Sequence, residues 1–317
     1  MAAENVVVSI CHPGKFGLVD HAEALVHYGQ RLDPQRTYVL AQGLDEVFAV
    51  ARRIRRTGNK AVCVVWDNSL ATFASAVLAK QLGLTFVYYY HEPGGIGQKL
   101  FKADPLLYSL KSSLGEWLMC QLADRRAVAR PDKLCFGDLY FPLLFDDQRP
   151  PWNSRKRVIG FLGARRNQRF FDLFQQMAPS FAAAGFEVAY FPSPESGRSR
   201  EEKFAFLANC TAIWNVYGVS FNQSGVTGDC FMSSTPVIAS HFEPYRELLA
   251  LHGKLVEVDL FQEPKDMCAR LVANLERLVQ ARPGQDPESL RQAQSAFGGA
   301  AAFSNHWLPV LGRLLDG

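Results

Sequence analysis

The stretch TFVYYYHEPGG, at residues 85–95, decides the fold class of this chain. Its β-branched and aromatic run predicts a buried strand over residues 85–90. Pro93 and the two glycines that follow it force the backbone out of the sheet. His91 and Glu92 are therefore expected at the carboxyl end of the strand, the edge where open α/β sheets bind ligands. Because a buried strand has no structural need for a histidine and a carboxylate at its tip, the pair indicates a chemical role.

Strands and helices are predicted to alternate on both sides of this stretch, which is typical of βαβ units and parallel sheets. The other predicted strands lie at residues 5–11, 36–41, 61–66, 157–163, 188–191, 210–216, 236–240 and 255–258. The first helical pattern begins at Asp20, which is expected to be its N-cap. The chain is expected to end in helices at about 264–281, 287–297 and 304–315.

The composition changes over residues 142–152, where paired aspartates and paired prolines are typical of a linker. A chain of 317 residues is long enough for two domains of about 150 residues each. We therefore expect an N-terminal domain over 1–148 and a C-terminal domain over 149–317, whose terminal helices could pack back on the first domain. The predicted fold class is α/β, with two Rossmann-like domains that face each other across a ligand-binding cleft.

The overall composition is that of a globular protein and excludes several classes. Hydrophobic residues make up 48% of the chain and charged residues 21%, and the net charge of +3 is too small for a dedicated nucleic-acid binder. The seven cysteines form no CxxC pair and are expected to be reduced and buried. Neither a signal peptide nor an apolar run of membrane-spanning length is present, so we expect a cytoplasmic protein.

Several common nucleotide-binding and hydrolase motifs are absent. The first predicted strand is followed by HPGKFG at residues 12–17, whose spacing differs from G-x-G-x-x-G. Neither the P-loop GxxxxGK[ST] nor the hydrolase elbow G-x-S-x-G occurs. These absences leave a two-domain enzyme that binds its ligand between facing halves.

Three stretches together resemble the GT-B glycosyltransferases, particularly the large retaining group that acts on nucleotide sugars. YYYHEP (88–93) resembles the N-domain strand that ends in His-Glu-Pro, and VIGFLGARRNQR (158–169) resembles the strand and basic loop that open the donor domain. SGVTGDCFMSSTPVIAS (224–240) resembles the donor-site segment. The resemblance implies a hexosyltransferase-type enzyme that moves a sugar from a nucleotide-diphosphate sugar to a glycan or glycolipid acceptor, with no metal and no cofactor.

The basic loop supplies the first group of predicted donor-binding residues. Arg165, Arg166 and Arg169 directly follow a predicted strand, where guanidinium groups could clamp a phosphate bidentately. The resemblance implies that one of them stabilises the leaving diphosphate. A solvated basic turn is the alternative explanation.

Residues 223–229 (QSGVTGD) are expected to form a loop that leads into a helix over 230–234. Helix N-termini bind phosphate, and glycines let the backbone approach it closely. The donor-binding residues expected in this segment are Gln223, Ser224, Gly225, Val226 and Asp229. Asp229 aligns with the second glutamate of the family's E-x7-E motif, which binds ribose hydroxyls, whereas Phe221 takes the first position. The motif is thus half present, and a helix N-cap is the alternative role for Asp229.

The acceptor side is expected on the N-terminal domain. The resemblance implies that His91 is a general base or a hydrogen-bond donor to the sugar, and that Glu92 binds acceptor hydroxyls or orients the histidine. Gly14 is a further predicted donor-binding residue, because the comparable glycine loop faces donor and acceptor in relatives. A polar strand end shaped by a turn is the alternative for His91 and Glu92. Asp67 ends the third predicted strand on the same edge, and an Asp-Asn-Ser turn explains it equally well.

Residues 99–118 form an apolar series with lysines 99, 102 and 111 beside it. Such segments can lie on anionic membranes, so we expect either peripheral contact with the inner face of a membrane or a pair of core helices divided at Pro105. The degenerate E-x7-E motif leaves open a second function, a catalytically silent GT-B-like binding or scaffold protein. A nucleotide-sugar epimerase of the same fold is a third possibility.

Overall fold

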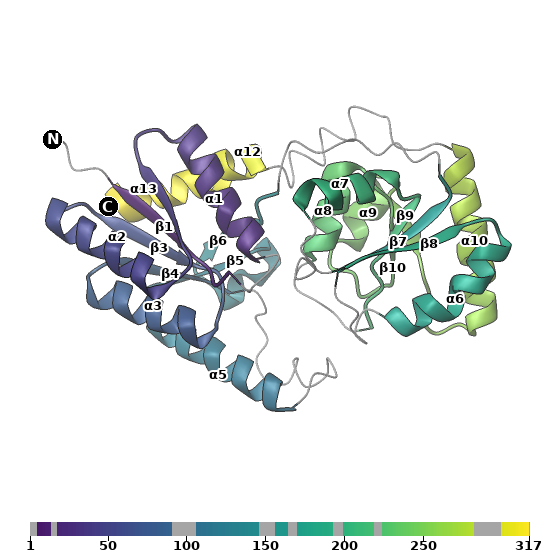
Figure 1. Cartoon of the computed structure of the whole chain (residues 1–317), viewed down its shortest axis with the longest axis horizontal. Coiled ribbons are helices and arrows are strands. Elements are labelled where there is room, and N and C mark those ends of the chain that lie inside the picture. The colour runs from purple at the N-terminus through teal and green to yellow at the C-terminus, as the bar shows by residue number, and fades with distance from the viewer. Residues whose placement is uncertain are drawn as a thin grey trace. The chain divides into compact units, whose positions relative to one another are not determined.

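A computed structural model describes residues 5–13, 18–90, 106–145, 156–163, 170–192, 199–218, 224–281 and 299–316. The chain divides into two compact units, Met1–Phe145 with Gly298–Gly317, and Asp146–Phe297 (Figure 1). Each unit is built on a parallel sheet with interleaved helices. The predicted fold class, α/β with two Rossmann-like domains, is therefore confirmed.

The first unit has a six-stranded sheet in the order β2-β1-β3-β4-β5-β6. Its strands are β1 (Val6–Ile10), β2 (Thr37–Ala41), β3 (Ala61–Val65), β4 (Thr85–Tyr89), β5 (Arg125–Val128) and β6 (Leu139–Tyr140). Its helices before the linker are α1 (Leu18–Leu32), α2 (Leu44–Thr57), α3 (Leu70–Gln81), α5 (Leu106–Leu122) and the short 3₁₀-helix η1 (Pro131–Phe136). Helix α1 begins before Asp20, which lies in its first turn and is not the expected N-cap.

The helices of the first unit form two layers (Figure 1). On one side α2 packs against α3 and α3 against α5, and all three bury apolar side chains on the same face of the sheet. Helix α1 lies on the other side, with the C-terminal helices beside it. This division follows from right-handed crossovers. The chain runs from β1 to β2 in one direction along the sheet and from β2 through β3 and β4 to β5 in the opposite direction, so the helices of the two runs lie on opposite faces.

The C-terminal segment returns to the first unit as α12 (Gly299–Ala302), the π-helical turn η4 (Phe303–Trp307) and α13 (Leu308–Asp316). Trp307 anchors it, because its fully buried indole stacks on Phe141 with ring centroids 3.9 Å apart and on Trp66 at 5.5 Å. Its ring nitrogen donates a 2.9 Å hydrogen bond to the carbonyl of Pro142. The last helix is thus part of the core of the first unit.

The second unit has a five-stranded parallel sheet in the order β11-β10-β9-β7-β8. Its strands are β7 (Val158–Leu162), β8 (Glu187–Phe191), β9 (Ala212–Trp214), β10 (Val237–Ala239) and β11 (Leu255–Glu257). Its helices are α6 (Phe171–Ala183), α7 (Arg200–Asn209), α8 (Gly225–Ser233), α9 (Arg246–Leu251) and α10 (Pro264–Ala281). One apolar cluster joins the sheet to α6 and α10.

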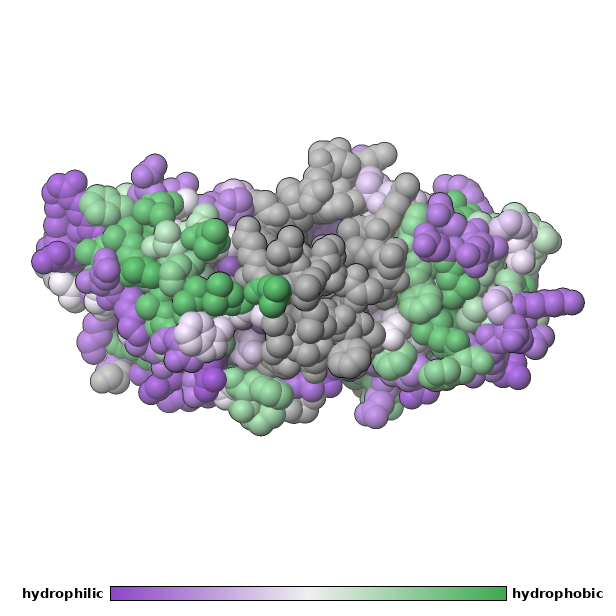
Figure 2. Space-filling view, turned by 90° about the horizontal axis from the view of Figure 1, so that it is seen from below, coloured by the Kyte–Doolittle hydropathy of each residue, from purple (hydrophilic) through white to green (hydrophobic). Residues whose placement is uncertain are grey.

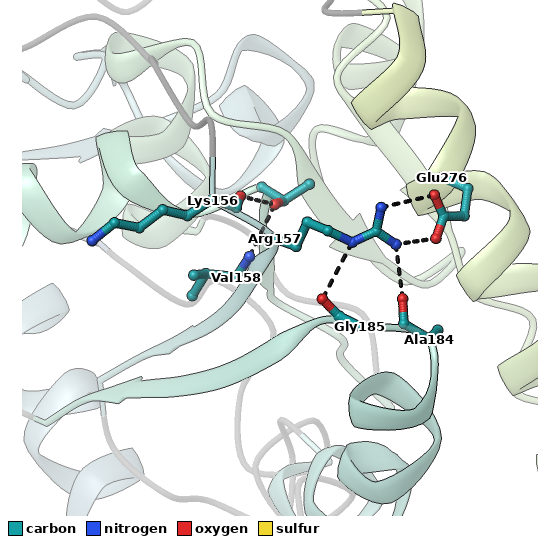
Figure 3. Close-up of polar contacts among 7 residues, drawn as sticks. Lys156, Arg157, Val158, Ala184, Gly185 and Glu276 are labelled. Carbon is teal, nitrogen blue, oxygen red and sulfur yellow. Dashed lines mark hydrogen bonds and ion pairs between the residues drawn. The ribbon is translucent and has the colours of Figure 1, made fainter.

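Arg157 clamps the base of this second sheet (Figure 3). Its guanidinium donates hydrogen bonds to both carboxylate oxygens of Glu276 on α10, and to the carbonyls of Ala184 and Gly185 at 2.8 and 3.2 Å. It also lies over the ring of Phe186, 4.2 Å from the centroid. The start of β7, the turn between α6 and β8, and α10 are thereby held together.

All seven cysteines are free, and five are buried, while Cys120 is partly exposed and Cys135 is exposed. The expectation of buried cysteines therefore fails at Cys135, which lies in η1. In the described part of the chain, no helix has both the length and the apolarity needed to cross a membrane.

Candidate donor site

The predicted site residues divide into described and undescribed ones. His91, Glu92, Gly14, Arg165, Arg166, Arg169 and Gln223 lie outside the described residues. Two described residues border these segments. Tyr90 lies between β4 and His91, and Phe170 directly follows the basic loop. Ser224, Gly225, Val226 and Asp229 are all described, and they belong to one structural feature, the start of α8.

Helix α8 begins five residues earlier than the sequence indicates. It spans Gly225–Ser233, and Ser224 is its N-cap, because the serine hydroxyl accepts a 3.2 Å hydrogen bond from the backbone N–H of Thr227. The predicted loop over 223–229 and helix over 230–234 are therefore wrong, and Asp229 is not the N-cap. Each glycine costs a helix about 1 kcal/mol relative to alanine, but α8 is buried from Thr227 onwards, and packing offsets that cost.

A buried polar network supports the first turn of α8. The side-chain amide nitrogen of Asn215 lies 2.9 Å from the hydroxyls of Ser224 and Thr227, and 3.1 Å from a carboxylate oxygen of Glu243. Thr227 donates a 2.8 Å hydrogen bond to the other oxygen of Glu243, and the hydroxyl of Tyr217 lies 3.2 Å from that of Ser224. All five side chains are buried, and Asn215 is completely inaccessible.

This network joins three segments that follow strands. Asn215 follows β9, Ser224 and Thr227 open α8, and Glu243 lies between β10 and α9. Because β9 and β10 are parallel neighbours, these segments meet at the carboxyl edge of the sheet, and α8 directs its N-terminal N–H groups there. Such an arrangement can bind an anion. Asn215 was not predicted as a site residue, although it is the polar residue that follows the apolar run of β9.

Asp229 lies in the second turn of α8 and forms an ion pair with Lys203 of α7. The ammonium nitrogen and a carboxylate oxygen are 3.2 Å apart, and the two side chains are only 14% and 13% exposed. Lys203 lies near the N-terminus of α7, where Ser199 and Glu202 form a capping box. The carboxylate is therefore oriented by a partner on a second, firmly capped helix.

The described ends of the two segments predicted to bind the donor contact each other. Phe170, directly after Arg169, has a left-handed backbone with φ 48°, which is strained for an aromatic residue. Its ring packs on Gly218, so closely that a Cβ at position 218 would lie 2.3 Å from a ring carbon. At the other end of the basic loop, Tyr190 donates a 3.0 Å hydrogen bond to the carbonyl of Gly163.

In the first unit, Asp67 lies at the carboxyl edge of the sheet and is buried. Its carboxylate accepts 2.8 Å hydrogen bonds from the backbone N–H groups of His12 and Ser69 and from the hydroxyl of Thr72. Burial alone would raise the pKa of Asp67, but these bonds together hold it below its ordinary value. The bond from Ser69 is the local turn that was one of the two explanations, and the bonds from His12 and Thr72 also fix the loop after β1 to the start of α3.

The described residues contain no group of three or more histidine, cysteine, aspartate or glutamate side chains that could hold a metal ion. No family model matches the chain, and no curated protein is similar to it in sequence.

Solved structures, by contrast, match the chain over nearly its whole length. AviGT4, a glycosyltransferase involved in avilamycin A biosynthesis, superimposes with a TM-score of 0.60 at 13% identity, over 99% of this chain and 98% of that one. Sucrose-phosphate synthase from Thermosynechococcus elongatus gives 0.64 at 12% identity, over 99% of both chains. Anabaena HepE in complex with UDP gives 0.61 at 9% identity, over 98% of this chain and 100% of that one. The chain therefore has the GT-B glycosyltransferase fold.

Proposed function

We propose that the protein is a glycosyltransferase that moves a sugar from a nucleotide-diphosphate sugar to a glycan or glycolipid acceptor. The observation that carries this proposal is the Ser224-capped start of α8, held by a buried network at the carboxyl edge of its sheet in a GT-B fold. A rigidly held helix N-terminus can contribute to binding a diphosphate, together with cations that offset the charge of the phosphates. The proposed enzyme is of the hexosyltransferase type and works without a metal or a cofactor.

The donor is proposed to bind the second unit. The N–H groups of Gly225 and Val226 open α8, where their position leaves them without an intrahelical partner, so they suit a phosphate oxygen. Asp229 then hydrogen-bonds the ribose, Gln223 lies next to the cap, and Arg165, Arg166 and Arg169 offset the charge that grows on the leaving diphosphate.

The acceptor is proposed to bind the first unit. His91 and Glu92 come just after Tyr90, which follows β4. The donor-binding residue Gly14 comes after β1, which ends at the same edge of the sheet. In this proposal His91 acts as the base or as a hydrogen-bond donor to the sugar, and Glu92 orients it or binds acceptor hydroxyls. A lipid-linked glycan is one such acceptor, and peripheral membrane contact through residues 99–118 would bring the protein to it.

The proposal is tested first with nucleotides and then with variants. UDP, GDP, ADP, CDP and dTDP are screened for thermal stabilisation, since a ligand of the native state raises the melting temperature. With the donor chosen in this way, Arg165→Ala together with Arg169→Ala should lower turnover about 10²–10³-fold. The melting temperature of the unliganded variant should not change. Full turnover in this variant would remove the basic loop from the site.

The half-present E-x7-E motif favours a second candidate, a silent GT-B-like binding protein, because Phe221 stands where relatives carry a glutamate. That protein would bind a nucleotide diphosphate but show neither transfer nor donor hydrolysis. An epimerase would convert the nucleotide sugar with no acceptor present. Incubation of a radiolabelled donor with and without glycan acceptors separates the three outcomes.

A further inference from the structure

Large apolar side chains are exposed on one helical layer of the first unit. They lie on α2 (Leu44 and Phe48), at the start of α3 (Leu70) and on α5 (Leu110, Leu114 and Trp117). These three helices cover the same face of the sheet. Among the described residues of α1, α12 and α13, on the opposite face, no large hydrophobic side chain is exposed to this degree. Leu134 and Phe136 of the short helix η1 are exposed as well, so the contrast holds between the two layers of longer helices that cover the sheet.

Helix α5 exposes apolar side chains on its outer face, where an ordinary surface helix exposes polar ones. Leu110, Leu114 and Trp117 follow the i, i+4, i+7 spacing of a single stripe, and Leu114 and Trp117 are 57% and 58% exposed. Glu116, by contrast, is buried, and Met119 faces the core. If α5 were only a core helix packed on the sheet, the position of Met119 would be explained but the exposed apolar stripe would not.

Helix α2, on the far side of α3 from α5, adds positive charge to the same layer, because its exposed Asp45 and Glu46 are outnumbered by four arginines. Arg52, Arg53, Arg55 and Arg56 are all exposed, and none of them forms an ion pair with a described residue. They follow Phe48 on the same helix. In Figure 2, which views this layer from below, hydrophobic residues gather over the first unit with hydrophilic residues at their margin.

We propose that the outer face of α2, α3 and α5 docks on the surface of an anionic lipid bilayer. Leucines, a phenylalanine and a tryptophan would enter the interface, where tryptophan is favoured, and the arginines would lie among anionic headgroups. A second copy of the chain fits less well, because an isologous dimer through this face would bring two clusters of unpaired arginines together. The docking is independent of the proposed function. Only the idea that docking brings the protein to a lipid-linked acceptor rests on that function.

The experiment is flotation of the full chain with mixed vesicles of phosphatidylcholine and anionic phosphatidylglycerol, against vesicles of phosphatidylcholine alone. We expect binding to the anionic vesicles only. Arg52→Gln with Arg55→Gln should weaken it about 25-fold, at about fivefold for each charge. Leu114→Ser with Trp117→Ser should weaken it about tenfold or more.

The matched control is Leu251→Ser with Phe261→Ser, two side chains of the second unit that are 77% and 83% exposed. This control should bind vesicles like the wild type. The proposal would be overturned by equal loss of vesicle binding in the control, or by no vesicle binding at all. It would also be overturned if the wild type were a dimer that Leu114→Ser with Trp117→Ser converts into a monomer. Nucleotide-induced thermal stabilisation is measured in every variant, so vesicle binding without any nucleotide binding would support docking and refute only the proposed function.

Discussion

The ion pair between Lys203 and Asp229 allows the donor site to be tested with a matched pair of variants. Lys203→Met removes the charge and keeps most of the apolar stem, and Asp229→Asn removes the opposite charge at nearly constant volume. Breaking one side of a fully buried pair costs about 3–5 kcal/mol, because the remaining charge is left uncompensated. Since both side chains are about one-seventh exposed, at 14% and 13%, we expect a smaller loss, about 1–3 kcal/mol for each variant.

The double variant reports the coupling between the two residues. Urea unfolding of the wild type, both single variants and the double variant completes a cycle, and we expect a coupling energy of about 1–2 kcal/mol, since contacting residues are not additive. The double variant should therefore be more stable than the sum of the single losses predicts. Additive losses would mean that the ion pair contributes nothing to the free energy of unfolding.

The same variants test the role proposed for Asp229. Calorimetry compares the nucleotide diphosphate chosen by the screen with its 2′-deoxy and 3′-deoxy forms. A hydrogen bond from a ribose hydroxyl to a carboxylate is worth about 1.5–3 kcal/mol, so the wild type should discriminate by about 10–100-fold against one deoxy form. Asp229→Asn should lose most of that discrimination. A folded Asp229→Asn protein that still discriminates like the wild type would show that Asp229 does not contact the ribose.

Three further changes test the structure around the site. Trp307→Ala should cost about 3–5 kcal/mol of unfolding free energy in urea, because a fully buried stacked indole leaves a cavity, and a loss below 1 kcal/mol would contradict its anchoring role. Arg157→Met should cost about 1–2 kcal/mol, discounted because the ion pair with Glu276 is about one-third exposed, and a neutral result would show that the clamp is dispensable. Asp67→Asn should destabilise the protein at pH 7, and this loss should shrink as the pH falls below about 4, since a carboxylate with a lowered folded pKa contributes stability above its unfolded pKa and loses it as the pH falls through the folded pKa. Urea unfolding at pH 7 and pH 3 checks this, and a pH-independent effect would contradict it.

The central strands were predictable because they are buried on both faces. β1, β3 and β7 are continuous apolar runs, which is the pattern that a covered parallel strand requires. β5 escaped prediction because it begins with two arginines and has only two buried residues. Its place in the sheet depends on pairing with β4 and β6, which are tertiary interactions that no local pattern records.

The site was predictable in part, and the limits follow from its construction. The segment that contains Ser224 and Asp229 could be identified by resemblance, but its glycines suggested a loop where packing enforces a helix. The partner of Asp229 could not be identified, because Lys203 lies on another helix and meets the aspartate only through the packing of α7 on α8. Likewise Asn215 and Glu243 are 28 residues apart and meet only because β9 and β10 are neighbours.

Glu243 explains why the proposed donor site needs more than the start of α8. A helix N-terminus is equivalent to about half a positive charge, whereas Glu243 places a carboxylate within hydrogen-bond distance of Thr227 in the first turn. An ionised carboxylate there would more than offset the helix dipole, so α8 alone would attract a diphosphate weakly. The contact between Phe170 and Gly218 brings the described ends of both donor segments together, directly after Arg169 in one case. Under the proposed function, strong diphosphate binding would therefore need cations from the basic loop as well as α8, which is why the paired arginine replacement is the decisive variant for that proposal.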